Sequence, residues 1–321
     1  MKPGEYVAWI GMDWADREHQ VCLRVQGSWR VEYQALKQEP KAIHDWVGQL
    51  RLRFGGGKVA IAVEQSRGAL LYALTAYDFL VLYPINPKAF CSYRKAFRLS
   101  GAKDDPSDAM LLLQFLGEHH AHLKAWEPED EGTRTLRYLV EQRRKLVDEQ
   151  TRYANRLISL LKEYFPQALH WFPSASHPRA LKFLKRWPSL EKAQRARSRT
   201  LREFFRSTRC RRARAEQIVD EIGQATALTD DPAVLRVYPL AARGLAVQME
   251  GLRGAIEELE EEMEQVLKEH PDREVFESLP GAGAVYVPRL IAAYGTDRDR
   301  FDAYAMQCFS GIAPVTKKSG N

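Results

Sequence analysis

The sequence predicts an α/β plus α fold class, with a mixed-sheet domain first and a mainly helical region after it. Two near-continuous apolar runs, residues 6–14 (YVAWIGMDW) and 58–64 (KVAIAVE), are typical of central strands that are buried on both faces. Later in the chain, residues 245–266 place an apolar residue at alternating steps of four and three, which is typical of a long helix that packs along one face.

The first 125 residues alternate between predicted strands and helices. Besides the two apolar runs, the pattern predicts strands at residues 19–26, 29–35 and 79–85, and helices at residues 41–54, 68–77 and 105–118. Three antiparallel strands, followed by helix, strand, helix and strand, is the element order of an RNase H-like core. We therefore expect residues 1–125 to form such a domain.

The middle of the chain is predicted to be helical. Residues 126–132 (WEPEDEG) are acidic and contain Pro and Gly, which indicates a domain boundary. A long helix is predicted at about residues 133–165, and with the helix at 245–266 it would form a coiled-coil region over residues 126–270. Two interpretations stay open at this point: the two helices form a local hairpin that packs on itself, or they form a contact between two copies of the chain.

Basic residues are concentrated in an insert at about residues 170–230. The whole chain has a net charge of +6, yet residues 179–214 alone hold fourteen Lys or Arg against two acidic residues. On a single helix, five of them would share one cationic face that binds nucleic-acid phosphates: Arg195, Arg199, Arg202, Arg206 and Arg209. A solvated basic helix is the alternative. The predicted nucleic-acid-binding arginines are Arg195, Arg199, Arg202, Arg206, Arg209, Arg211 and Arg212.

Other features of the composition limit the class of protein. No run of about 18 apolar residues is present, so we expect no transmembrane helix and no membrane partner. The N-terminus lacks the pattern of a signal peptide. Four cysteines are widely scattered, which suits a reducing cytoplasm and argues against a zinc site or a disulfide framework. The sequence therefore predicts a cytoplasmic protein.

Four carboxylates form the candidate catalytic and metal site. Asp13 and Glu64 stand near the ends of the two buried strands, where an ionised carboxylate is costly unless it is solvated, paired or bound to a cation. If these strands are neighbours, both carboxylates meet at one sheet edge, joined there by Asp105 and Asp108, which share one helix face. Such an edge would hold two Mg²⁺ ions about 4 Å apart, which Mn²⁺ could replace.

The last two of these residues have a second interpretation. Asp105-Pro-Ser-Asp108 is also a good helix start, with Asp105 as the N-cap and Asp108 stabilised by the helix dipole. Taken alone, the pair is better explained by capping; the metal site is favoured only because Asp13 and Glu64 are predicted at the same edge. The neighbouring Asp16 and Asp104 are weaker candidates.

Residues 279–283 (LPGAG) separate two predicted helices and have the form of a helix–hairpin–helix turn. Gly281 and Gly283 allow a tight turn and let backbone amides approach a phosphate. An ordinary connection between two helices is the alternative. We expect this turn to belong to a small helical domain at residues 271–321.

Several motifs, in this order, resemble the DEDD transposases of the insertion-sequence 110 family, to which the Piv-type DNA invertases are related. The motifs are GMDWADREH (11–19), AVEQSRG (62–68), YPINPKAF (83–90), SGAKDDPSDA (100–109), LPGAGAVYVPRLIAAYG (279–295) and FSGIAPVTKKSG (309–320). The family's order Asp, Glu, Asp, x, x, Asp maps onto Asp13, Glu64, Asp105 and Asp108.

The resemblance implies three domains: a RuvC-like nuclease domain (1–125), a coiled-coil region (126–270) and a C-terminal transposase domain (271–321). It implies a serine nucleophile, which Ser319 matches better than Ser310 does. It also implies a structured guide (bridge) RNA that pairs with donor and target DNA. In a homo-oligomer, a dimer or a tetramer, the serine of one subunit would complete the carboxylate site of another.

The resemblance therefore implies an RNA-guided, Mg²⁺-dependent DNA recombinase. Because the chain stops at Asn321 whereas similar sequences continue with a basic tail, the C-terminal domain is expected to be truncated. Two alternatives stay open: a RuvC-like, structure-specific endonuclease that uses water, and a truncated nucleic-acid-binding remnant without strand transfer.

Overall fold

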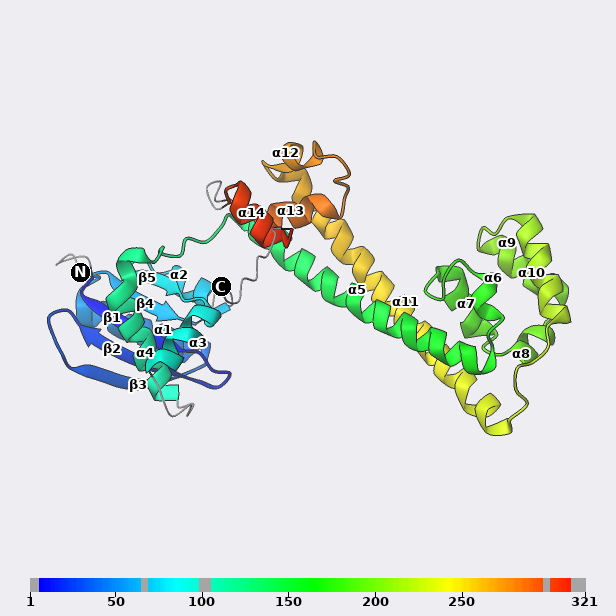
Figure 1. Ribbon diagram of the computed structural model, residues 1–321, viewed down its shortest axis with the longest axis horizontal. Helices are drawn as coiled ribbons and strands as arrows, with labels where there is room; N and C mark the ends of the chain where they lie inside the picture. Colours follow the sequence, from blue (N-terminus) through cyan, green and yellow to red (C-terminus); the bar gives the residue numbers. More distant parts are fainter. Residues whose placement is uncertain (1–5, 65–68, 98–104, 297–300, 313–321) are drawn as a thin grey trace, which may run out of the picture. The chain divides into compact units, whose positions relative to one another are not determined.

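The computed structural model describes residues 6–64, 69–97, 105–296 and 301–312, and it divides the chain into two compact units, Met1–Pro128 and Glu129–Asn321 (Figure 1). Each unit is described below by itself. Within the described ranges, no helix is both long and apolar enough to cross a membrane.

The first unit is built on a mixed sheet whose described strands have the order β3-β2-β1-β4-β5. They are β1 (Ala8–Asp13), β2 (Glu18–Val25), β3 (Val31–Lys37), β4 (Val59–Val63) and β5 (Leu80–Pro84). The pairs β1–β2 and β2–β3 are antiparallel, whereas β1–β4 and β4–β5 are parallel. The mixed sheet and its helices confirm the predicted α/β class.

Helices cover both faces of this sheet. Alternation along β1 sends Ile10 and Met12 to one face, where α1 (Pro40–Phe54) and α2 (Ala69–Thr75) pack, and Trp9 to the other, where α4 (Asp105–His119) packs. The helix α3 (Pro87–Phe97) follows β5 and was not predicted from the sequence. The pair Asn86-Pro87 is the sequence feature that marks the start of this helix. The Asn86 side chain accepts a hydrogen bond from the amide of Lys88 at 2.8 Å, as an N-cap residue does.

The helix α4 lies unusually close to β1 because residue 11 has no side chain. A Cβ atom on Gly11 would stand 2.1 Å from the carbonyl oxygen of Ala109 and 2.4 Å from the amide nitrogen of Leu113. Further along α4, Gly117 lies beside the side chain of Arg24, whose strand partner is Trp9. The helix therefore runs antiparallel to β1, and its first turn lies toward the end of the strand that carries Asp13.

Replacing Gly11 by Ala should destabilise the first unit by about 1–3 kcal/mol, because the new methyl group meets backbone atoms that cannot rotate away. Denaturant unfolding followed by circular dichroism measures this loss. The matched control is Gly48→Ala on α1, where an added Cβ meets nothing within 4 Å; helix propensity should make that variant as stable as the wild type or up to about 1 kcal/mol more stable. Equal stability of Gly11→Ala and the wild type would contradict this packing.

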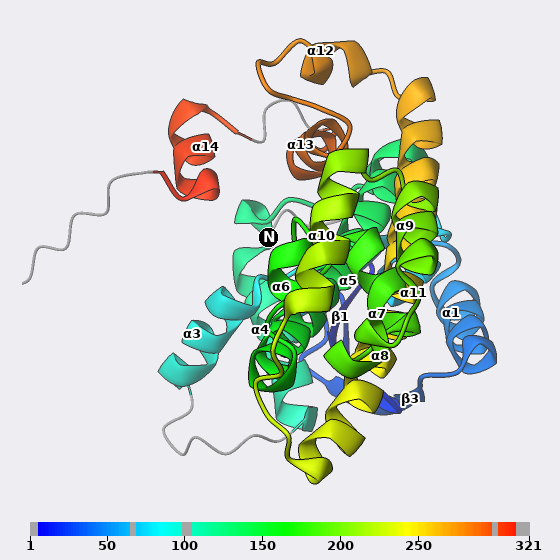
Figure 2. The ribbon, with the colours of Figure 1, turned by 90° about the vertical axis from the view of Figure 1, so that its right-hand side faces the viewer.

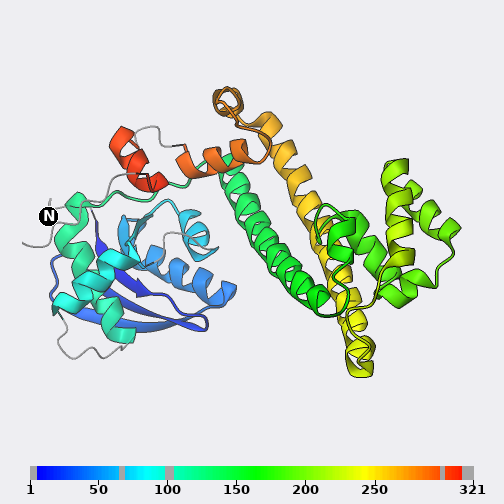
Figure 3. The same cartoon turned by 45° about the vertical axis from the view of Figure 1, so that its right-hand side comes forward.

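The second unit is organised by two long helices, α5 (Glu131–Tyr164) and α11 (Pro232–Glu269), which lie side by side along much of their length (Figures 1 and 3). On α11, the residues Leu245, Met249, Ile256 and Met263 of the predicted seam are buried. Since α5 is the main partner of α11, the seam forms a local helical hairpin. A contact between two copies of the chain stays a prediction.

Short helices fill the connection between the two long ones and lie beside one part of the hairpin (Figures 1 and 3), and Figure 2 shows them in front of it. They are α6 (Ala168–Trp171), α7 (Pro178–Arg186), α8 (Leu190–Gln194), α9 (Ser198–Ser207) and α10 (Arg212–Gln224). Their shared core is aromatic: Phe183 packs against Trp187 and Phe204, and all three side chains are buried. These aromatic rings are therefore not available to stack on nucleic-acid bases.

After α11 come α12 (Arg273–Glu277), α13 (Tyr286–Tyr294) and α14 (Ala303–Ser310). The helix α13 is anchored to the hairpin by Val287 and Ile291, which share a buried cluster with Leu136 of α5 and Leu267 of α11. The start of the hairpin and α13 therefore form one packed region.

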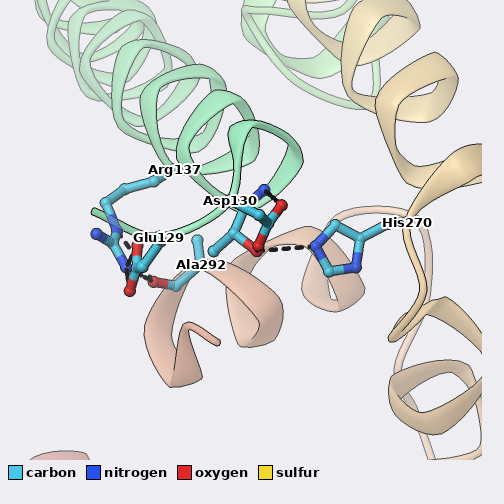
Figure 4. A network of polar contacts seen from close by, with 6 residues as sticks. Glu129, Asp130, Arg137, His270 and Ala292 are labelled. Atoms are coloured by element: carbon cyan, nitrogen blue, oxygen red, sulfur yellow. Dashed lines mark hydrogen bonds and ion pairs between the residues drawn. The ribbon is translucent and has the colours of Figure 1, made fainter. Parts of the chain in front are cut away.

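Polar contacts lock the same region (Figure 4). The carboxylate of Asp130 caps α5 by accepting bonds from the amide and the hydroxyl of Thr133, at 2.9 and 2.6 Å. Nδ1 of His270 accepts the Asp272 amide, so Nε2 carries the proton and donates to the Thr133 hydroxyl at 2.9 Å. Arg137 adds a second tie by donating to the carbonyl of Ala292 on α13.

Thr133→Val should lower the free energy of unfolding by about 1–3 kcal/mol, because it removes the hydroxyl that bonds the Asp130 carboxylate and leaves Nε2 of the buried His270 without this partner. Thermal or urea unfolding of the full chain measures the loss. Thr151→Val is the control on the same helix: its exposed hydroxyl bonds only the Val147 carbonyl, so little change is expected.

The loss should also depend on pH. Burial raises the pKa of Asp130, but the bonds from Thr133 and the nearby His270 outweigh it and hold that pKa below its usual value. A depressed carboxyl pKa stabilises the fold above the unfolded-state pKa, and this stabilisation is lost as the pH falls through the folded-state pKa. The difference in the free energy of unfolding between the wild type and Thr133→Val should therefore be constant near neutral pH and should become smaller below about pH 4.

Candidate active site

Asp13 and Glu64 lie at the carboxyl ends of two adjacent parallel strands. The register pairs Met12 with Val63, so the next residues along β1 and β4 are Asp13 and Glu64. Neighbouring strands are about 4.8 Å apart. Because side chains alternate along a strand, Asp13 lies on the same face of the sheet as Gly11, which is the face that α4 covers. Glu64 lies on that face too, and both carboxylates are half-buried.

The first turn of α4 lies toward the same edge. Asp108 is only 1% exposed, and its Oδ2 accepts a hydrogen bond at 2.7 Å from Nη1 of Arg94 on α3. The Arg94 guanidinium also lies over the ring of Phe90, 5.9 Å from its centroid. Asp105 is the first residue of α4, and its side chain lies outside the described part of the structure. The pairing with Arg94 is a role for Asp108 that helix capping alone does not explain.

A buried histidine supports the turn that follows Asp13. Nδ1 of His19, on β2, accepts a hydrogen bond from the amide of Ala15, and Nε2 lies 2.6 Å from Oε1 of Gln38. Burial lowers the pKa of His19 more than the bond to Gln38 raises it, so the ring is neutral at pH 7. The sequence analysis did not single out His19. The feature that could have pointed to it is a histidine at a strand position where the side chain faces the core.

The carboxylates suit a divalent metal in kind, since hard oxygen donors are what Mg²⁺ and Mn²⁺ prefer. Asp13 and Glu64 lie at the same edge of the sheet, and Asp108 is buried on α4, the helix that covers this face of the sheet. Among the side chains that the structure describes, no group of three or more His, Cys, Asp or Glu converges on a point that could hold a metal ion. The described carboxylates thus match a divalent cation in the chemistry of their oxygen donors, whereas the described side chains do not form a complete ligand set around one point.

Comparison with known proteins identifies the family. Residues 10–166 match the DEDD model of the IS110 transposases, and residues 273–321 match the model described as transposase IS116/IS110/IS902 family. The chain is 31% identical over 321 residues to a Streptomyces coelicolor protein described as a mini-circle transposase for IS117, covering 97% of this chain and 77% of that relative. The chain belongs to the IS110 family of transposases.

Two further relatives agree with this assignment. The transposase is 29% identical over 223 residues to a 43.6 kDa protein of insertion element IS110 from Streptomyces coelicolor, which covers 68% of this chain and 54% of that protein. It is 26% identical over 222 residues to the transposase y4uE of Sinorhizobium fredii, covering 68% of this chain and 62% of the relative. The chain thus spans between about half and about three quarters of these relatives.

The expected nucleophile of the transposase, Ser319, lies outside the described residues. The weaker candidate Ser310 is the last residue of α14, and its hydroxyl donates to the Gln307 carbonyl at 3.1 Å. The role of either serine stays a prediction.

The expectation of one cationic helix in the basic insert is wrong. Arg195 follows the end of α8, and Arg209 lies beyond α9 with φ 57°, a left-handed conformation that ends a helix. The first break is stabilised by Gln194, whose amide donates to the carbonyls of Ile222 and Ala225 on the other side of the aromatic core. Of the seven arginines, Arg199, Arg202, Arg206 are on α9, and Arg211 and Arg212 begin α10.

Acidic neighbours reduce the charge of this insert. Arg195 pairs with Glu191 at 2.5 Å, and Arg199 pairs with Glu203 at 2.9 Å. Arg202 pairs with Glu216 of α10 at 2.6 Å. Arg206, Arg209, Arg211 and Arg212 form no ion pair with a described acidic residue, so they remain the stronger candidates for binding nucleic-acid phosphates.

The turn at residues 279–283 joins α12 to α13, as expected for a helix–hairpin–helix arrangement. Gly281 adopts φ 79°, which a residue with a side chain rarely does. The carbonyl of Gly283 accepts the amides of Tyr286 and Val287 and so begins α13. Contact between this turn and a phosphate stays a prediction.

Arg94→Ala should destabilise the transposase by about 3 kcal/mol, because it leaves the buried carboxylate of Asp108 without its guanidinium partner. The double variant Arg94→Ala/Asp108→Asn should lose less, since a neutral amide needs no counter-charge. Arg51→Ala, which breaks the exposed pair with Asp78, is the control and should cost less than about 1 kcal/mol. Urea unfolding separates the three; equal losses for Arg94→Ala and Arg51→Ala would contradict the buried pair.

Proposed function

We propose that this IS110-family transposase cuts and rejoins DNA by phosphoryl transfer at the sheet edge that carries Asp13 and Glu64. The observation that supports the proposal most is the register of β1 and β4, which brings two carboxylates to adjacent strand ends on the face covered by α4. Such carboxylates are retained at a cost to stability, which is typical of catalytic residues.

In this proposal, Asp13, Glu64, Asp105 and Asp108 would hold two Mg²⁺ ions. Bound there, the metal would supply Lewis-acid stabilisation of the charge that develops on the phosphate oxygens. The neutral His19 keeps the turn after Asp13 in place, and Arg94 balances the charge of Asp108 when its carboxylate is not bound to a cation.

Ser319 is the proposed nucleophile. Its hydroxyl would lose a proton and attack the scissile phosphorus, and one deoxyribose oxygen would leave. The covalent phosphoserine preserves the energy of the broken phosphodiester, so rejoining needs no outside source of energy. The alternative of a RuvC-like endonuclease replaces the serine with water and yields only cut DNA.

The partners of the reaction are also proposals. By resemblance to the family, a structured bridge RNA would choose the donor and target DNA by base pairing, and a dimer or tetramer would join the serine of one subunit to the carboxylates of another. Exposed arginines on the basic insert support binding to phosphates, which carries no sequence information by itself.

The full chain, purified with any RNA that accompanies it, provides the test. With DNA that carries the sites matching that RNA, and with Mg²⁺, we expect recombined product and a serine-linked DNA intermediate. Asp13→Asn should lower the rate of cleavage by at least about 100-fold without loss of binding, and chelation of the metal should have the same effect. Ser319→Ala should remove the covalent intermediate.

Asp16→Asn is the matched control, because Asp16 lies in the exposed turn after Asp13, and it should keep its activity. Nicks that form equally well with Ser319→Ala would favour the endonuclease. Binding of nucleic acid without any cleavage would favour a non-catalytic remnant.

A further inference from the structure

A basic hollow of about 250 Å³ lies in the second unit, where α5, α11 and the start of α13 meet. Figure 3 shows α13 beside the first half of α5. Three arginines line the hollow: Arg143 and Arg144 from α5, and Arg289 from α13. Its lining residues belong neither to the basic insert nor to the four candidate carboxylates.

The arginines of the hollow differ in how they are held. Arg143 is 19% exposed, and its guanidinium donates to Glu260 of α11 through Nε at 2.7 Å, which fixes it in the wall. Arg144 and Arg289 are exposed, and neither forms an ion pair with an acidic side chain in the described ranges. Since Glu260 neutralises Arg143 and Asp148 is the one acid among the lining residues, Arg144 and Arg289 leave the hollow with a small net positive charge.

Four of the eight lining residues are apolar. They are Val140 and Val147 of α5, Met263 of α11 and Val285 before α13. Apolar side chains beside a guanidinium lower the local dielectric constant, which strengthens its attraction for an anion. A planar guanidinium with paired N–H donors matches the oxygens of a phosphate better than an ammonium group does.

The size of the hollow limits the ligand. Its volume lies below the range of about 300–1,000 Å³ that is common for sites of whole small molecules. A site of this size suits one phosphodiester group with part of its sugar, and the rest of the ligand must continue over the surface. A nucleic-acid strand has this form.

An exposed aromatic ring adjoins two of the lining residues, Val285 and Arg289. Tyr286, the first residue of α13, is 57% exposed, and the guanidinium of Arg289 lies 5.8 Å from the centroid of its ring. Bases of a single strand stack on such rings, whereas the bases of a duplex are already stacked on each other. The ring therefore favours a single strand over a duplex.

We propose that this hollow, together with the neighbouring Tyr286, binds single-stranded nucleic acid. A backbone phosphate lies between Arg144 and Arg289, and the adjoining base stacks on Tyr286, while Arg143 stays in the wall as the partner of Glu260. The inference builds on the proposed function only in that the chain handles nucleic acid; it does not require cleavage or the assignment of any catalytic residue.

The test measures binding of the full chain to labelled 20-nucleotide strands by fluorescence anisotropy over a series of salt concentrations. For Arg144→Ala/Arg289→Ala, we expect about tenfold weaker binding at low salt and a shallower salt dependence, lower by about 0.7 in slope for each lost phosphate contact. The control Arg152→Ala/Arg253→Ala removes two arginines from α5 and α11 that pair with Glu149 and Glu257. That variant should bind like the wild type.

Variants of Tyr286 distinguish the contribution of base stacking to binding from that of charge. Tyr286→Phe should bind a single strand as the wild type does, and Tyr286→Ala should bind it about tenfold more weakly with an unchanged salt slope. Binding to a duplex of the same length should be unaffected by Tyr286→Ala. A loss of duplex binding alone, or equal binding by Arg144→Ala/Arg289→Ala and the control, would overturn the proposal.

Strands of RNA and of DNA form two arms of the experiment, and the arm with the larger loss identifies the source of the phosphate. Asp13→Asn, tested in parallel, should bind both strands normally. If the wild type shows no cleavage but Arg144→Ala/Arg289→Ala still weakens binding, the proposed recombinase function fails and the binding site stands. If cleavage is observed and these variants bind normally, the reverse holds.

Discussion

The close approach of α4 to β1 at Gly11 is the contact on which the first unit depends. Backbone atoms of Ala109 and Leu113 occupy the space that any side chain at residue 11 would need. This contact sets the height of the helix above the sheet, and its antiparallel direction brings the first turn of α4 toward the end of β1. The distance between Asp108 on the helix and the strand-end carboxylates is therefore decided at a glycine that carries no chemistry itself.

The same edge concentrates negative charge, and the fold compensates for it locally. Arg94 neutralises Asp108, and a neutral His19 holds the turn beside Asp13 without adding a charge of either sign. A buried carboxylate is costly without a positive charge beside it, and the arginine on the neighbouring α3 supplies that charge. In the proposed site, Arg94 and the metal would be alternative partners of this buried carboxylate.

In the second unit, too, the residues that hold the helices in place differ from the residues that carry the charge. The aromatic core and the Thr133–His270 contact hold the hairpin and α13 in place, whereas exposed arginines carry the charge. Acidic partners neutralise several arginines of the insert, including Arg195 and Arg202, but leave Arg144 and Arg289 open. The number of arginines in a segment is therefore a poor guide to where an anion binds, because ion pairs decide which of them are available.

The sequence by itself determined the α/β class, the two buried strands that lead to Asp13 and Glu64, the buried seam of α11 and the membership of the IS110 family. These follow from local periodicity and motif order, which the chain carries without reference to its partners in space. Tertiary structure decided the rest: the break of the basic insert into separate helices, the pairing of Asp108 with Arg94, and the hollow between α5 and α13. Each of these depends on side chains that are far apart in the sequence and meet only when the cores pack, so no local pattern could contain them.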